Sequence, residues 1–479
     1  YGVLSYLGAY NLMRGCAVRL DSVEIFNFKN VKYGFLDFGN ARKKYNSSIL
    51  GLYGQNGSGK TALIEAIALL KCLLTGQPVP SSFAECVNVD SCAASFRFKF
   101  KIICDTEKTA EYIVLYGFSI RKDIDENVSN MEQVYKHKVT VFDETLSVSS
   151  KVSKKNKRLF SWIDTRTEKA FIPISKLKLL IGRKEEAQTD LLVTKKIAAA
   201  TSRSFIFSRE LVTKIREQCQ DQGYLDMYNA LIYYGNYELF VIDTRNSGLI
   251  SINALPISFS YEEKGQVATG NLLVQLNGVS FIPEPAMGIV RKLISSMNIV
   301  LQEIIPGLKI EIKELGNQIQ KDGIQVCCVQ LMSLKNSKSI PLQYESEGIK
   351  KIISVLNLLI GVYNKPSITV AIDELDAGIF EYLLGELLSI IADKGKGQLI
   401  FTSHNLRPLE TLDRGFIAFT TTNPEKRYIR LKNIKTNNNL RDFYYRDIML
   451  GEQDEPVYEP TNRYDIAFAL KEAGDSIGA

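Results

Sequence analysis

The stretch that decides the fold reads Gly54-Gln55-Asn56-Gly57-Ser58-Gly59-Lys60-Thr61, and it matches the pattern G-x-x-x-x-G-K-[ST] at every fixed position. The preceding residues 48–53 predict a short buried strand, and the following residues 62–74 predict a helix. Glycines let backbone N–H groups turn inward, and a helix N-terminus adds partial positive charge. We therefore predict a phosphate-binding loop for ATP, formed by Gly54, Asn56, Gly57, Ser58, Gly59, Lys60 and Thr61.

Within this loop the two side chains at its end carry the chemistry. Lys60 would reach the β- and γ-phosphates of ATP, and the Thr61 hydroxyl would bind Mg²⁺.

Two later segments supply the remaining groups of a nucleotide site. The apolar run 368–372 predicts a strand, and it ends in Asp373 and Glu374. Asp373 would hold Mg²⁺, usually through water, and Glu374 would polarise the water that attacks the γ-phosphate. A second strand, 397–403, ends at His404, which is one of only two histidines in the chain. The other, His137, lies in a Lys-rich alternating segment, and we interpret it as structural or exposed.

Composition limits the class of protein. The chain has 479 residues, 45% of them hydrophobic and 23% charged, which is typical of a globular protein with two or three structural units. Its eight cysteines form no C-x-x-C pair, so we predict reduced thiols in a cytoplasmic protein. No apolar run has the length of a membrane span, so we expect no membrane association.

The pattern along the chain predicts an α/β fold with a mixed sheet, an antiparallel β subdomain and a helical insertion. Alternating residues 95–102 and 111–118 predict half-buried antiparallel strands. The predicted units are an N-terminal extension of unknown role (1–19), the first part of an ATPase head (20–148), a basic and mostly helical insertion (149–235), the second part of the head (236–450) and a C-terminal tail (451–479).

Positive charge is concentrated in one segment. The chain has a net charge of +6, while residues 149–220 carry 17 Lys and Arg against seven Asp and Glu, an excess of ten. Residues 151–158 are rich in lysine and lie close to Trp162, the only tryptophan. This combination could bind nucleic acid, but a solvated helical arm is the commoner explanation and the one that we favour.

The order of the motifs adds a resemblance. Ser346-Glu347-Gly348 precedes a helical run, the acidic strand and His404, and in this order the motifs resemble those of the ABC-type ATPases of the SMC and RecF group. The resemblance implies that Ser346 and Gly348 cap the γ-phosphate bound by another subunit, that His404 contacts the γ-phosphate, and that the ATPase is a homo-oligomer, at least a dimer. For the glutamine loop of such ATPases, Gln77 and the strands near residue 100 are candidates.

The spacing of the motifs and the sequences around them narrow the resemblance to one group of these ATPases. The 313 residues between Lys60 and Asp373 exceed the spacing of transporter subunits and fall far short of long SMC arms, and the 75 residues after His404 leave no room for a fused nuclease. Residues 373–382 and 402–410 resemble the ATPases of bacterial anti-phage defence systems, in particular the AriA family of the PARIS system.

That resemblance implies a ring-like homo-oligomer that holds a toprim-like nuclease effector until a phage-encoded trigger protein releases it, with weak or no DNA binding. Two alternatives stay open. One is a DNA-repair or DNA-maintenance ATPase that grips DNA through residues 149–220, and the other is a scaffold that binds ATP but hardly hydrolyses it.

Overall fold

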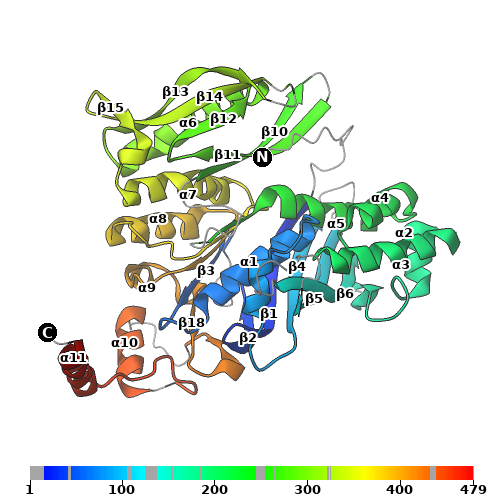
Figure 1. Ribbon diagram of the computed structural model, residues 1–479, viewed down its shortest axis with the longest axis horizontal. Coiled ribbons are helices and arrows are strands. Elements are labelled where there is room, and N and C mark those ends of the chain that lie inside the picture. Colours follow the sequence, from blue (N-terminus) through cyan, green and yellow to red (C-terminus); the bar gives the residue numbers. More distant parts are fainter. Residues whose placement is uncertain are drawn as a thin grey trace.

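The computed structural model describes residues 16–40, 42, 45–104, 110–124, 137–152, 155–156, 158–182, 185–243, 254–263, 266–320, 323, 325–431, 439–451 and 453–477. The predicted fold class is confirmed: the chain is an α/β protein with one mixed sheet, an antiparallel β subdomain and a group of helices beside it (Figure 1).

A six-stranded sheet, here called the central sheet, organises the molecule. Its order is β19 (Tyr428–Ile429), β18 (Ile417–Thr420), β3 (Ser48–Tyr53), β17 (Gln398–Thr402), β16 (Thr369–Ile372) and β9 (Leu239–Ile242). All neighbouring pairs are parallel except β18 and β19.

Helices cover both faces of the central sheet, so its strands are mainly apolar. Leu50 and Ile400 on one face join the core that contains α1 (Lys60–Leu74). Ile49 and Leu399 on the other face join the core that contains α7 (Glu347–Asn364) and α8 (Glu381–Lys394). The ends of these strands are therefore held rigidly from both sides.

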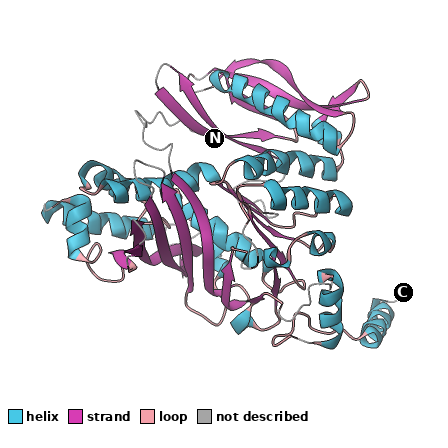
Figure 2. Cartoon of the chain, turned by 180° about the vertical axis from the view of Figure 1, so that it is seen from behind, coloured by secondary structure: helices cyan, strands magenta, loops and turns pink. Residues whose placement is uncertain are grey.

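A seven-stranded sheet, the antiparallel sheet, packs on the α1 side (Figure 2). Its strands are β1 (Cys16–Phe28), β2 (Val31–Asp37), β4 (Ala94–Cys104), β5 (Ala110–Ile124), β6 (His137–Val152), β7 (Lys155–Asn156) and β8 (Phe160–Asp164). The side chains of β4 alternate between buried and partly or fully exposed, as the sequence predicts. The first strand starts earlier than predicted, because residues 16–20 pair with β4, so residues 16–19 belong to the sheet and not to an extension.

One cysteine pair corrects the prediction of reduced thiols. Cys16 and Cys104 face each other in the register of β1 and β4 and form a disulfide, with 3.9 Å between their Cα atoms. The remaining six cysteines are thiols. The sequence gives no signal for this pair, because 88 residues separate its members and only strand pairing brings them together.

The basic segment is a packed layer and not a solvated arm, which corrects the interpretation that we favoured. It begins inside β6 and continues through β7 and β8 before α2 (Ile174–Ile181), α3 (Glu185–Ala200), α4 (Arg209–Gln218) and α5 (Gln222–Tyr233). Leu180, Leu191 and Ile215 are fully buried in the core shared with the antiparallel sheet. The helices of this segment therefore contribute to the core that also contains α1.

Trp162 is also part of that core. Its side chain is 1% exposed, and its ring lies 4.2 Å from the Tyr224 ring, with the Lys176 ammonium above both. It is therefore not available to stack on a nucleic-acid base, contrary to that hypothesis. The side chains of residues 151–157 lie outside the described residues, and Arg158 is exposed.

The second part of the chain adds a third sheet. The hairpin β10 (Ala254–Glu263) and β11 (Gln266–Gln275) precedes β12 (Val279–Pro283), β13 (Leu308–Ile319), β14 (Gln325–Lys335) and β15 (Lys338–Pro341), which pair with one another. Helix α6 (Glu284–Ile304) packs on this sheet.

Three helices lie in the last part of the described chain, one between β17 and β18 and two after β19. They are α9 (Arg407–Thr411), α10 (Leu440–Leu450) and α11 (Arg463–Ile477), of which α11 stands apart from the body of the molecule (Figure 1). Within the described residues, none of the helices combines the length and hydropathy needed to cross a membrane.

A partly buried lysine in α1 gives a pH-dependent prediction. Lys71 Nζ donates to the Leu239 carbonyl at 2.6 Å, and burial lowers the pKa of Lys71 to about 8. Between pH 8 and about 10 the unfolded chain therefore binds the proton more strongly than the folded chain, so stability from this group rises with pH. The free energy of unfolding of the wild type relative to Lys71→Met should rise by about 1 kcal/mol per pH unit in this window.

Urea unfolding at a series of pH values measures this difference. Lys196→Met, which removes an exposed lysine of α3, is the matched control for loss of one charge. A difference between wild type and Lys71→Met that does not change from pH 8 to 10 would contradict the burial of the Lys71 ammonium.

Candidate nucleotide site

The predicted site residues meet at one edge of the central sheet. Strand β3 leads into the phosphate loop, β16 into Asp373 and Glu374, and β17 into Ser403 and His404. These strands are parallel neighbours in the order β3, β17, β16, so their carboxyl ends lie side by side. Motifs that are hundreds of residues apart in the sequence therefore form one site.

The phosphate loop is closed over its own lysine. Lys60 Nζ donates to the carbonyl oxygens of Gly54 and Gln55, at 2.8 and 3.0 Å. Gly54 has φ 151°, and a Cβ at this position would lie 1.8 Å from Thr420 Oγ1, so only glycine fits. The loop therefore presents the Lys60 ammonium at its mouth, where it can exchange carbonyl oxygens for phosphate oxygens.

The other loop residues lie around this ammonium. Asn56 and Gly57 are exposed, Ser58 is buried with its hydroxyl bonded to the Gln55 carbonyl, and Thr61 is half-buried in the first turn of α1. Gly59 has φ 94° and begins α1 in the left-handed region, which favours glycine.

One hydroxyl forms hydrogen bonds to both acidic residues that follow β16. Thr402 Oγ1 donates to Asp373 Oδ1 at 2.5 Å and accepts the N–H of Glu374 at 2.8 Å. Asp373 is 2% exposed, whereas Glu374 is exposed and has φ 48°, a left-handed conformation that is costly for a residue other than glycine. Asp373 is thus held inward, and Glu374 is left at the surface of the site.

Lys60 and these acids form one electrostatic group. Burial lowers the pKa of Lys60, and the negative charges of Asp373, Glu374 and Asp376 oppose that shift. The carboxylates therefore lie close enough to Lys60 to favour the charged form of its side chain.

His404 is positioned through its backbone. Asp376 Oδ2 accepts the N–H groups of His404 and Asn405, at 3.1 and 3.0 Å. Partial burial of the ring and the positive charge of Lys60 lower the pKa of His404, so the imidazole is neutral near pH 7 and can donate one N–H.

The structure places Ser346 and Gly348 at the N-terminus of α7, which contacts the segment that follows the two acids. Ser346 caps α7 by accepting the Ile349 N–H at 3.3 Å, and it is exposed. Gly348 touches the turn formed by residues 373–378, here called the acidic turn, because a Cβ on Gly348 would lie 2.2 Å from the Gly378 carbonyl oxygen. Among the contacts of the described residues, none joins Ser346 to the loop of its own chain.

The candidates for a glutamine loop were wrong. Gln77 lies beyond the far end of the 15-residue helix α1, which is about 22 Å long, and the strand around residue 100 belongs to the antiparallel sheet. The position beside Asp373 is occupied by Asp243, because Asp243 follows β9, and the Asp373 N–H donates to the Ile242 carbonyl at 3.0 Å. An acid that ends a predicted strand was the available signal. Thr402 and Asp376 were likewise present in the motifs but received no role.

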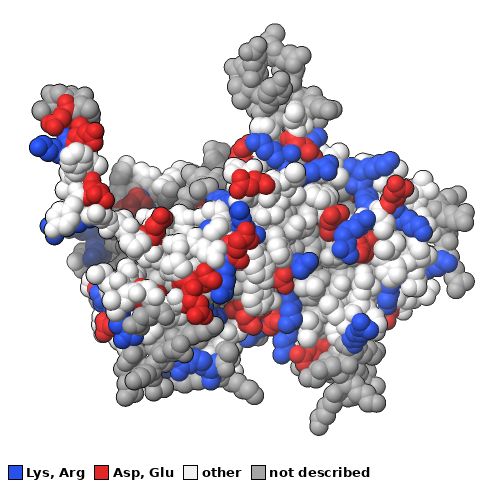
Figure 3. Space-filling model, turned by 90° about the horizontal axis from the view of Figure 1, so that it is seen from below, with Lys and Arg blue, Asp and Glu red and all other residues white. Residues whose placement is uncertain are grey.

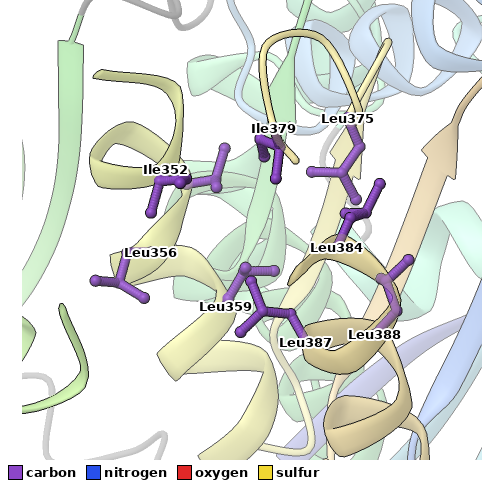
Figure 4. Close-up of a pocket in the computed structure, with 9 residues that line it drawn as sticks. Ile352, Leu356, Leu359, Leu375, Ile379, Leu384, Leu387 and Leu388 are labelled. Carbon is purple, nitrogen blue, oxygen red and sulfur yellow. The ribbon is translucent and has the colours of Figure 1, made fainter. Parts of the chain in front are cut away.

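An apolar cavity lies beneath the acidic turn (Figure 4). Leu375 of the acidic turn and Ile379, which follows the turn, point toward side chains of α7 and α8. The residues that line it are all apolar: Ile352, Val355, Leu356, Leu359, Leu375, Ile379, Leu384, Leu387 and Leu388. The side chains around the cavity therefore pack beneath the turn, and they offer no polar partner for a nucleotide.

Comparison with known proteins agrees with an AAA-type domain. Residues 22–229, which include the phosphate loop, match the family described as AAA domain. No curated protein matches the sequence.

Similar solved structures come from SMC heads and RecF. One is the SmcHead bound to the C-winged helix domain of ScpA, with 12% identity, coverage of 86% of this chain and 98% of that chain, and a TM-score of 0.36. Another is the recombination mediator protein RecF-ATPrS in the RecFOR pathway, with 15% identity, coverage of 86% and 98%, and a TM-score of 0.35. A third is the SMC head domain from Thermotoga maritima, with 12% identity, coverage of 87% and 100%, and a TM-score of 0.33.

The contact of α7 with the acidic turn predicts the effect of one methyl group. In Gly348→Ala the new Cβ meets a backbone oxygen at 2.2 Å, so α7 or the turn must move, and we expect a loss of about 1–3 kcal/mol in the free energy of unfolding. Denaturant unfolding measures the loss.

Gly361→Ala in the same helix is the matched control. Its new Cβ would meet only Ile368 side-chain atoms, at 3.7 and 3.9 Å, and alanine is the better helix former by about 1 kcal/mol, so this variant should be as stable as the wild type or more so. Equal stability of Gly348→Ala and the wild type would show that α7 does not rest on the turn.

Proposed function

We propose that the protein is an ATPase that hydrolyses ATP to ADP and phosphate at sites shared between two copies of the chain. The observation that supports this most strongly is the meeting of Lys60, Asp373, Glu374 and His404 at one sheet edge, while the Ser346 hydroxyl is exposed and bonds only within its own helix among the described contacts. A site that lacks its cap within one chain is completed by a second chain.

The residues present fit Mg²⁺. The Thr61 hydroxyl and the Asp373 carboxylate supply the hard oxygen ligands that Mg²⁺ prefers. The described residues hold no cluster of three or more His, Cys, Asp or Glu side chains that could bind a metal. This suits Mg²⁺, which binds through one or two protein groups together with phosphates and water. When bound, Mg²⁺ would offset the charge of the phosphates.

The chain's own residues perform the rest of the reaction. Lys60 binds the β- and γ-phosphates, and the exposed Glu374 carboxylate takes the proton of the water whose oxygen attacks the γ-phosphorus. The bond between the γ-phosphorus and the bridging oxygen breaks, and ADP leaves with the electron pair. His404 donates an N–H to a γ-phosphate oxygen, and Ser346 with Gly348 of the second copy presents a helix N-terminus to it.

For the cellular role we propose the sensor and scaffold component of an anti-phage defence system, cytoplasmic and ring-like, of the AriA type. Its partners would be a toprim-like nuclease effector and a phage-encoded trigger protein. The resemblance of residues 373–382 and 402–410 to the ATPases of such systems supports this proposal. An intact Glu374 favours an active ATPase over a scaffold that only binds ATP.

A DNA-repair or DNA-maintenance ATPase is the second candidate, favoured by the ten excess positive charges of residues 149–220. The burial of Trp162 weakens it, because the segment loses its stacking tryptophan. On the face seen in Figure 3, Lys and Arg side chains are interspersed with Asp and Glu side chains.

Mixing two inactive variants tests the shared site. Lys60→Ala should abolish ATP binding at its own loop, and Ser346→Arg should block only the site of its partner. Each variant alone should be inactive, but a mixed dimer contains one intact site, so partial ATP hydrolysis should return on mixing. Phosphate release over a range of ratios measures it.

The matched control for mixing uses Glu374→Gln with Lys60→Ala. Both lesions then act on the loop's own subunit, so each site of a mixed dimer stays defective and no activity should return. If Ser346→Arg behaves like Glu374→Gln in this assay while mixed dimers form, the sites are not shared.

Salt-dependent DNA binding separates the two cellular roles. In a defence ATPase, duplex DNA should neither bind tightly at about 150 mM salt nor stimulate ATP hydrolysis. In a DNA-maintenance ATPase, several basic residues would contact phosphates, each adding about −0.9 to the slope of log affinity against log salt. Changing Lys151, Lys154, Lys155, Lys157 and Arg158 to Glu should then flatten that slope, and such a result would overturn the defence proposal.

A further inference from the structure

Helix α7 carries a buried lysine that the reaction above does not use. Lys351 is 2% exposed, and its Nζ has no hydrogen-bond partner among the described residues. Its neighbour Lys350 is different, because its Nζ lies 2.6 Å from Glu347 Oε1. A buried ammonium without a partner is unfavourable, so the surroundings of Lys351 must supply the attraction that keeps it charged.

Those surroundings are the acidic turn. Burial lowers the pKa of Lys351, and Asp376, Asp373 and Glu374 oppose the shift, with Asp376 the strongest of the three. Gly348, one helical turn before Lys351, touches Gly378 of the same turn. The carboxylates of the acidic turn therefore lie close enough to Lys351 to act on its charge.

Asp376 has an unpartnered atom of the opposite charge. Its Oδ2 accepts the N–H groups of His404 and Asn405, while its buried Oδ1 has no partner within the described part of the chain. A buried ammonium and a buried carboxylate oxygen, each without a hydrogen-bond partner among the described residues, thus lie on adjacent elements. One belongs to the helix that begins at Ser346, and the other holds the backbone of His404.

We propose that Lys351 is a positioning residue that attracts Asp376 and thereby fixes His404 relative to the N-terminus of α7. The inference rests on the proposed ATPase reaction and deepens it. Since Ser346 serves the nucleotide of the partner and His404 serves that of its own chain, Lys351 joins the elements of two nucleotide sites through one buried charge. It does not contact the phosphate loop, so it acts on turnover and not on ATP binding.

The test compares binding, turnover and stability of Lys351→Met, which keeps the length of the side chain and removes its charge. The affinity for ATP should stay within about three-fold of wild type, while kcat should fall by about 10²-fold, the size expected when a catalytic group is misplaced by about 1 Å. The melting temperature should fall, because removing the ammonium leaves the buried Asp376 carboxylate oxygen without its compensating charge, and the retained ATP affinity shows that the variant is still folded.

Lys71→Met is the matched control, since Lys71 is a half-buried lysine whose pKa is also lowered by burial but which donates to the Leu239 carbonyl. This control should keep the wild-type kcat. Wild-type turnover in Lys351→Met would overturn the inference, and so would a loss of ATP affinity as large as the loss of turnover, since that would make Lys351 merely structural.

The failure of the proposed function gives a separate result. If the wild type does not hydrolyse ATP, or if Lys60→Ala binds ATP as the wild type does, the ATPase proposal fails before Lys351 is considered. An active wild type together with an active Lys351→Met variant overturns only the role of Lys351.

Discussion

The hydroxyl of Thr402 positions the two acidic residues of the candidate site. It donates to Asp373 Oδ1 and accepts the N–H of Glu374, so one buried side chain on β17 fixes both acids that follow β16. The Leu375 N–H adds a third link, to the Thr402 carbonyl at 3.0 Å. A hydrogen bond to a buried carboxylate is stronger than one between neutral groups, and its loss leaves a charge unpaired. The positions of the acids opposite Lys60 depend on this contact.

The two hydrophobic cores of the molecule support different parts of the site. The core with α1 and the antiparallel sheet fixes the phosphate loop, and the core with α7 and α8 fixes the acidic turn. The central sheet lies between them, with alternate side chains of each strand in each core. Its ends are rigid for this reason, and the loops that leave them can carry strained residues such as Glu374 at φ 48°.

Two buried lysines of the site are subject to the same negative charges. Lys60 and Lys351 are both buried, which lowers the pKa of each, and Asp373, Glu374 and Asp376 oppose that shift in both. Such an arrangement costs stability, because desolvated ammonium groups lack full compensation. Functional sites commonly carry this cost, since a site that binds a polyanion must present cations before the ligand arrives.

The sequence by itself determined what local patterns encode. The phosphate loop, the acidic strand, His404, the helix after Ser346 and the alternating strands follow from short motifs and from periods of two or 3.6 residues. Only the tertiary structure decided the disulfide of Cys16 and Cys104, the burial of Trp162, and the approach of Asp243 and Lys351 to the site. Each of these depends on which distant strands and helices become neighbours. Burial of a charged or aromatic side chain is a property of that packing, and residues adjacent in sequence do not reveal it.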